Sequence, residues 1–200
     1  MTEIIKSIIS NVLTALYQPF GFAVILAMLF MFLYLFAKEH GWKESVKQWW
    51  RNFKSDKTFR KVLFLAFYTN MILFRTLLCR SLWFNPLSNV IGVWGLHNSK
   101  GELTTEVIEN LVLFIPFVVL LLWCFHDKLV GKSNKLWRTI WQATKFTFLF
   151  SLSIEFAQLF FHLGTFQLSD LFYNTLGGLL GGLIYWICGV IHSKTSSKQD

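Results

Sequence analysis

The sequence predicts an all-α fold: a polytopic helical bundle in a membrane, with about five transmembrane helices and an N-terminal amphipathic helix. Hydrophobic residues make up 54% of the 200 residues, and 22 Phe and 9 Trp contribute to an aromatic share of 18%. A soluble domain of this length does not need so much apolar surface. The apolar residues also form runs long enough to cross a bilayer, with the basic residues concentrated between them.

Residues 1–18 contain the predicted amphipathic helix. Ile4, Ile8 and Val12 begin an apolar stripe at helical spacing, and Lys6 lies on the opposite face. Such a helix lies in the membrane interface or leads into the first membrane span. The segment lacks the basic start and the small-residue cleavage site of a signal peptide, so we do not interpret it as one.

The membrane domain is predicted over residues 19–191. Its expected transmembrane helices cover residues 19–37, 62–79, 108–125, 140–161 and 171–191. Residues 192–200 are short and polar, and we expect them to form a disordered cytoplasmic tail.

The basic loops predict the orientation of the bundle. Residues 38–61, residues 126–145 and the tail together hold 15 of the 19 Lys and Arg. With five spans, all three fall on one side, which the positive-inside rule assigns to the cytoplasm. The N-terminus, the loop 81–107 and the short break at 162–169 are then outside the cell, in a multi-pass membrane protein.

The net charge of +8 could also indicate a nucleic-acid partner. The most basic stretch, residues 38–61, carries Trp42, Trp49 and Trp50 and lies between two predicted spans. Tryptophan and lysine in that position are typical of a membrane surface, where the rings reach headgroup level. We therefore expect membrane lipids as partners, and no nucleic acid.

Polar side chains interrupt the most apolar stretch of the chain, residues 151–182. Glu155 and Gln158 are spaced three apart, and Asp170 and Asn174 four apart, so each pair lies on one helical face. The predicted orientation brings these pairs toward the outer surface, together with polar residues from other helices. The predicted binding residues are Arg75, Arg80, Asn110, Glu155, Gln158, Asp170 and Asn174.

A lone charge in the membrane centre costs about 2.5–3.5 kcal/mol on insertion scales, so these groups need partners or a function. We expect Glu155 and Arg75 to offset each other. The network could simply fix helix packing, but several polar groups gathered on one side favour a polar cavity. Glu155 and Asp170 are also the candidate catalytic residues, as an acid/base pair, although this pattern alone is a weak indication.

Four glycines follow the polar residues: Gly177, Gly178, Gly181 and Gly182. Their spacing predicts close helix packing within the bundle. His162 is interpreted as a solvated loop residue rather than a base or ligand. The three cysteines have no metal-ligand spacing, and no metal site or cofactor is predicted.

Several stretches resemble the VanZ-like membrane family. They are RTLLCR (75–80), NPLSNVIGVW (85–94), ENLVLFIPF (109–117), SIEFAQLF (153–160) and DLFYNTLGGLLGG (170–182). The resemblance covers residues 60–190, and the I-E-x-x-Q and D-x-x-x-N-x-x-G-G patterns are its most specific parts.

The resemblance implies a polytopic bacterial membrane protein linked to low-level resistance to teicoplanin, a lipid-anchored glycopeptide. It does not imply a defined reaction. We therefore expect a non-enzymatic envelope protein with an outward-facing polar pocket, whose partner is a lipoglycopeptide or a lipid-linked cell-wall precursor. The alternative is a membrane enzyme or flippase acting on such a precursor. No inverted repeat supports the flippase.

Overall fold

The computed structural model of the protein describes residues 25–26, 28–29, 31–78, 83–97, 101, 104–131 and 135–196. Within these ranges the regular structure is helical, with no β-strand, which confirms the predicted all-α class. The predicted N-terminal amphipathic helix lies outside the described residues.

Among the residues that the structure describes, three helical segments are long and apolar enough to cross a membrane. They are Lys57–Leu78, formed by α3 (Lys57–Leu73) and a π-helical turn (Phe74–Leu78); α4 (Glu106–Leu129); and the Leu168–Ile191 part of α6 (Leu168–Ser196). These segments contain the predicted spans 108–125 and 171–191 entirely and most of 62–79.

The predicted span 140–161 lies within α5 (Leu136–Phe161), which is not among the three candidate spans. Lys145, Glu155 and Gln158 make this helix less apolar than its neighbours. The last span was predicted to end at residue 191. In the structure α6 continues to Ser196, so residues 192–196 extend the helix instead of belonging to the predicted disordered tail.

The basic stretch 38–61, predicted as a loop, contains a helix of its own, α2 (Trp42–Ser55). Trp42, Trp49 and Phe53 recur at helical spacing along one face, a periodicity that the high charge of the segment obscured. Asp56 then ends α2 and begins α3, because its carboxylate accepts a 2.7 Å hydrogen bond from the Thr58 N–H.

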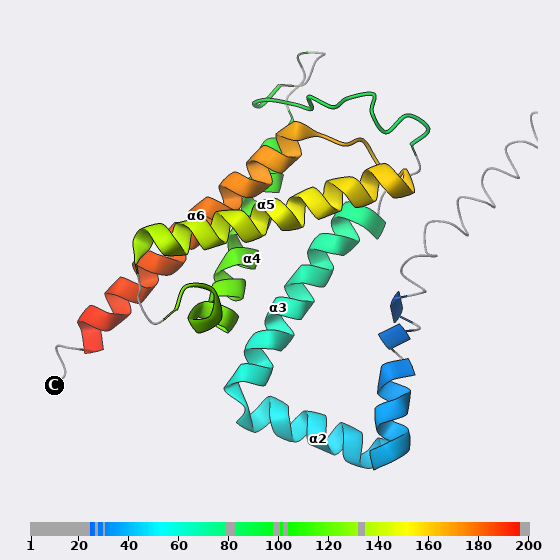
Figure 1. Ribbon diagram of the computed structural model, residues 1–200, viewed down its shortest axis with the longest axis vertical. Helices are drawn as coiled ribbons and strands as arrows, with labels where there is room; N and C mark the ends of the chain where they lie inside the picture. The colour runs from blue at the N-terminus through cyan, green and yellow to red at the C-terminus, as the bar shows by residue number, and fades with distance from the viewer. Residues whose placement is uncertain are drawn as a thin grey trace, which may run out of the picture.

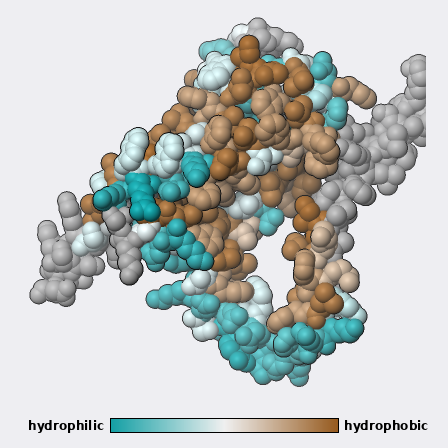
Figure 2. Space-filling view, in the orientation of Figure 1, coloured by the Kyte–Doolittle hydropathy of each residue, from teal (hydrophilic) through white to brown (hydrophobic). Residues whose placement is uncertain are grey.

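Figure 1 shows that α4, α5 and α6 lie together, whereas α2 extends from the far end of α3 and turns away from this group. In Figure 2, hydrophilic side chains cover α2 and the neighbouring end of the bundle, and hydrophobic side chains dominate the surface above them. The polarity of the surface therefore changes along the direction of the long helices.

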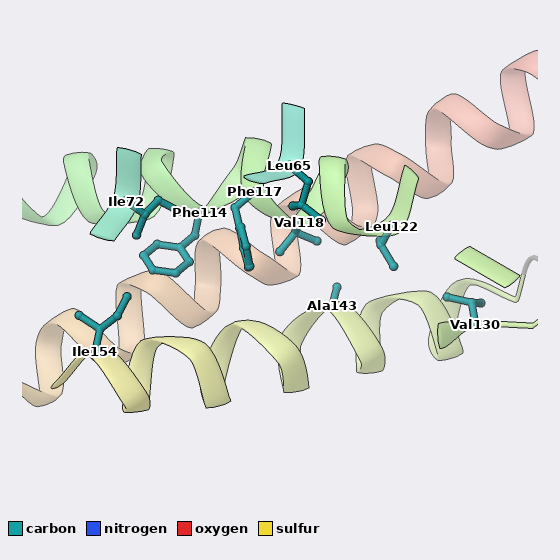
Figure 3. Close-up of a cluster of buried hydrophobic side chains, with 9 residues drawn as sticks. All are labelled: Leu65, Ile72, Phe114, Phe117, Val118, Leu122, Val130, Ala143 and Ile154. Atoms are coloured by element: carbon teal, nitrogen blue, oxygen red, sulfur yellow. The ribbon is translucent and has the colours of Figure 1, made fainter. Parts of the chain in front are cut away.

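The hydrophobic core lies between α3, α4 and α5, as Figure 3 shows. Phe114 and Phe117 of α4 contact the ring of Phe150 on α5, and α3 adds Leu65 and Ile72. Within a membrane the alternative environment of these side chains is lipid, so they hold the helices together by van der Waals packing.

The glycines of α6 face two different helices. A Cβ atom on Gly177 would collide with the backbone carbonyl of Leu111 on α4, and one on Gly181 would lie 2.7 Å from the Ile115 carbonyl. On the neighbouring face, a Cβ on Gly178 would meet Thr147 of α5. The absence of side chains thus lets α6 approach α4 and α5 at the same time.

Candidate functional site

Buried polar side chains gather at the end of the bundle where α5 ends and α6 begins. Members of this polar cluster come from the π-helical turn, α4, α5, α6 and the residues just before α6. The polar cluster consists of Thr76, Asn110, Ser151, Glu155, Gln158, Gln167, Ser169, Asp170 and Asn174. All of them except the half-buried Asn110 are at most 9% exposed. Such burial requires that their hydrogen-bonding groups find partners inside the protein.

A regular register between α5 and α6 brings the cluster together. Gly182 lies opposite Ala143, and Gly178 lies opposite Thr147. One step further, the Asn174 amide donates a 2.9 Å hydrogen bond to Ser151. Each step moves four residues along both helices in opposite directions. Continued by one more step, the same spacing pairs the positions of Asp170 and Glu155, the two candidate catalytic carboxylates.

Glu155 connects α5 to the turn that precedes α6. Its Oε2 atom accepts a 2.8 Å hydrogen bond from the backbone N–H of Gln167. Because Glu155 is only 2% exposed, this backbone group is satisfied in a place that water does not reach. The carboxylate therefore helps to fix the path of the turn.

Gln158 connects α5 to a distant part of the chain. Its Nε2 atom donates a 2.8 Å hydrogen bond to the carbonyl of Thr76 in the π-helical turn. A π-helical turn changes the carbonyl pattern of the helix, and such turns occur frequently at functional sites. Gln158 thus ties the end of the second predicted span to the polar cluster.

Asp170 and Asn174 complete the cluster from α6. The Asn110 amide of α4 donates a 2.8 Å hydrogen bond to Asp170 Oδ1. Asn174 is 4% exposed, and its amide nitrogen is occupied by Ser151. Its Oδ1 atom is buried without a hydrogen-bond partner, so one acceptor in the cluster is left unsatisfied.

The loop 83–97 covers the turn between α5 and α6, as Figure 1 shows. Backbone hydrogen bonds join the two segments: Trp83 N–H to the His162 carbonyl at 2.8 Å, Phe166 N–H to Pro86 at 2.9 Å, and Leu168 N–H to Val90 at 2.8 Å. These hydrogen bonds hold the loop against the turn that carries Gln167 and Ser169, two members of the polar cluster.

Gly92 is required where the loop meets the cluster. Its φ of +76° favours glycine, and a Cβ atom there would collide with the Ser169 hydroxyl. The loop can approach the start of α6 so closely only because this residue has no side chain.

Arg75 does not pair with Glu155 as expected. Its guanidinium instead forms an ion pair and hydrogen bond with Glu109 of α4, whose other carboxylate oxygen accepts a 2.6 Å hydrogen bond from the Thr105 hydroxyl. Both side chains of the ion pair are about half exposed. Arg75 therefore lies at the rim of the cluster, paired with Glu109, which is not among the predicted binding residues. Arg80 lies outside the described residues.

His162 ends α5 in a left-handed conformation, with φ of 55°. Its Nδ1 atom lies 3.1 Å from the Trp83 carbonyl, and the side chain is exposed. Among the residues that the structure describes, no group of three His, Cys, Asp or Glu side chains could hold a metal ion. The described side chains of the cluster include two buried carboxylates, Glu155 and Asp170, together with amides and hydroxyls.

Sequence reasoning missed Ser151, Thr76 and Gln167, because isolated Ser, Thr and Gln are common in helices and turns. A signal was present in α5. Five residues spaced four apart are all buried, and small or polar residues occupy this stripe: Thr139, Ala143, Thr147, Ser151 and Glu155. The stripe faces the glycines and the polar residues of α6.

Comparisons with known proteins agree on one family. The sequence profile of the VanZ/LLP1 family matches residues 20–189. Protein VanZ of Enterococcus faecium is 30% identical over 105 residues, which cover 48% of this chain and 59% of that protein. The chain thus matches less than two thirds of the length of this relative. No solved structure gives a significant match.

Proposed function

The chain belongs to the VanZ/LLP1 family, and we propose that it is a protein of the bacterial cell membrane that lowers susceptibility to teicoplanin through its polar cluster. In this proposal the protein binds a polar group of the lipoglycopeptide, or of a lipid-linked cell-wall precursor, and catalyses no reaction. The link to resistance comes from the resemblance to the VanZ-like family, and the family profile and the matched relative, Protein VanZ, support that resemblance.

The proposal rests on the side-chain oxygen of Asn174, Oδ1, which is buried among polar groups and has no hydrogen-bond partner. An unpaired buried polar atom costs about 1–3 kcal/mol. A ligand that offers an N–H or O–H group would remove this cost. Sugars and peptide amides, which glycopeptides and cell-wall precursors both contain, offer such donors.

The proposal also requires that the cluster lies on the outer side of the membrane. The basic stretches 38–61 and 126–145 belong to the opposite end of the long helices, which supports this orientation. In a variant without native cysteines, Ser88→Cys in the exposed loop should react with a membrane-impermeant maleimide added to intact cells. Asn134→Cys should react only after lysis. The reverse pattern would contradict the orientation.

Susceptibility measurements test the proposal directly. The wild-type chain, expressed in a teicoplanin-sensitive host, should raise the minimal inhibitory concentration of teicoplanin. Glu155→Gln, Asp170→Asn and Asn174→Leu should abolish this protection at equal membrane abundance. Ser153→Ala, which changes an exposed hydroxyl on the same helix, should retain it. Full protection by all three cluster variants would refute the proposal.

The position of Asp170 opposite Glu155 favours a second candidate, a membrane enzyme that uses the two carboxylates as acid and base. Two carboxylates in one buried site can be held in different protonation states, as general acid–base catalysis requires. Purified protein should then convert a prenyl-phosphate-linked precursor, and Glu155→Gln should abolish turnover. Protection without turnover by the wild type would favour binding over catalysis.

A further inference from the structure

A polar pocket lies at the opposite end of the bundle from the polar cluster. It occupies about 370 Å³ between the start of α3, the end of α4 and the middle of α6. Its polar side chains are Thr58, Lys61, His126, Asp127, Lys128 and Tyr185. We propose that this pocket, which we call the basic pocket, binds the phosphate of an anionic phospholipid headgroup. This inference does not depend on the proposed function, because it concerns different residues.

Lys61 is one of the two lysines that line the basic pocket. The Nζ atom donates a 3.2 Å hydrogen bond to the Trp123 carbonyl and lies 4.9 Å from the centre of the Trp123 ring. An ammonium group has three N–H donors, so two remain for a ligand. Trp123 is 44% exposed, and a tryptophan beside a lysine is typical of the headgroup level of a membrane.

Lys128 and His126 supply further groups from the end of α4. The helix loses its regular geometry at Phe125, where φ is −127° and ψ is 24°, directly before these residues. Lys128 Nζ lies 5.8 Å from the centre of the Phe125 ring. The His126 Nδ1 atom is buried and has no hydrogen-bond partner. The residues that line the basic pocket therefore include two lysines and a histidine with a buried nitrogen that has no hydrogen-bond partner.

The charge of the basic pocket selects an anion. Lys61 and Lys128 outweigh the single carboxylate of Asp127, so the lining has a positive balance even with a neutral histidine. The Tyr185 ring lies 5.7 Å from the His126 ring and adds a hydroxyl to the lining. Ammonium, imidazole and hydroxyl groups together offer the donors that phosphate oxygens accept.

The membrane is the source of phosphate that the location favours. The basic pocket lies where two candidate spans, Lys57–Leu78 and Glu106–Leu129, have their basic ends. Basic pockets between transmembrane helices at this level bind anionic lipid headgroups in other membrane proteins. The ligand is therefore a phosphate diester with acyl chains that extend along the bundle.

Native mass spectrometry of the purified full-length protein in detergent tests the inference. Dioleoyl-phosphatidylglycerol should bind at least fivefold more tightly than zwitterionic dioleoyl-phosphatidylcholine. The double variant Lys61→Gln and Lys128→Gln should weaken phosphatidylglycerol binding roughly tenfold or more, because each lysine attracts the anionic headgroup. The matched control Lys43→Gln and Lys145→Gln removes the same charge from exposed positions outside the pocket and should change binding less than twofold.

Three results would overturn the inference: equal binding of the two lipids, equal losses in the two double variants, or inorganic phosphate binding as tightly as the lipid. The last result would assign the pocket to free phosphate. If the pocket double variant does not fold, Tyr185→Phe replaces it, since this change removes only a hydroxyl. It should weaken phosphatidylglycerol binding about threefold, and unchanged phosphatidylglycerol binding would count against the inference.

Discussion

The backbone N–H of Gln167 donates a 2.8 Å hydrogen bond to the buried carboxylate of Glu155, twelve residues earlier in the chain. The interaction joins the last turns of α5 to the residue just before α6. The most conspicuous charge in the apolar stretch therefore organises a turn in addition to any role toward a ligand.

We expect Glu155→Ala to destabilise the protein by about 1–3 kcal/mol, because the buried Gln167 N–H would lose this acceptor. Glu155→Gln keeps an acceptor oxygen and should cost less. Thermal unfolding in detergent, followed by circular dichroism, measures both. Ser153→Ala provides the control, and an equal melting temperature for Glu155→Ala and the control would show that the hydrogen bond does not stabilise the turn.

Gly182→Ala should destabilise the packing of α6 on α5, because the new methyl group would lie 2.6 Å from the Cβ of Ala143. The exchange Gly182→Ala with Ala143→Gly should recover part of the loss, since the other neighbours are at least 3.6 Å away. Recovery is incomplete because glycine within a helix costs about 1 kcal/mol. The melting temperatures of the wild type, Gly182→Ala and the double variant test this expectation. A double variant no more stable than Gly182→Ala would contradict the register between α5 and α6.

Gly177→Ala should be more damaging than Gly182→Ala, since its methyl group would meet the backbone carbonyl of Leu111. No side-chain replacement at Leu111 can move a carbonyl oxygen. Leu111→Ala should therefore fail to rescue Gly177→Ala. The same thermal unfolding assay tests this expectation, and a rescued melting temperature would show that α4 and α6 can separate easily.

The ion pair between Arg75 and Glu109 should contribute about 1 kcal/mol or less, because both side chains are about half exposed. Glu109→Arg alone places two cations together and should lower the melting temperature. The exchange Arg75→Glu with Glu109→Arg should restore most of the stability. If the exchanged protein is stable but no longer protects against teicoplanin, Arg75 acts toward the ligand and not only toward Glu109.

His162→Val should destabilise the protein by roughly 1–2 kcal/mol, because a β-branched residue rarely adopts the left-handed conformation found at this position. His162→Asn should cost less, since asparagine tolerates this conformation. Unfolding measures the first effect. Teicoplanin susceptibility of His162→Asn tests the second, because lost protection in a stable protein would give the imidazole a role beyond ending α5.

The sequence was a good guide to the α4 and α6 segments because their apolar runs are long and uninterrupted. It was a poorer guide to α2, where the helical spacing of Trp42, Trp49 and Phe53 is mixed with lysines. α5 was predicted as a span from its Phe and Leu content. In the structure, the small and polar residues of α5 face α6. They are therefore buried inside the bundle.

Part of the polar cluster was predictable for a physical reason. Glu155, Gln158, Asp170 and Asn174 stand out because charges and amides are costly among apolar neighbours. Their partners do not stand out. Glu155 binds a backbone N–H and Gln158 binds a backbone carbonyl, and every residue other than proline has both groups. Pairings of this kind depend on the folded path of the chain and not on residue type.

The glycine faces of α6 also have a consequence for biogenesis. A ribosome delivers α6 after α4 and α5, yet α6 supplies Asp170 and Asn174 and the smooth surfaces against which both earlier helices rest. Until α6 has been synthesised, Asn110 and Ser151 therefore lack their hydrogen-bond partners, Asp170 and Asn174. A nascent chain that stops before α6 would therefore expose Asn110 and Ser151 without the partners that Asp170 and Asn174 supply.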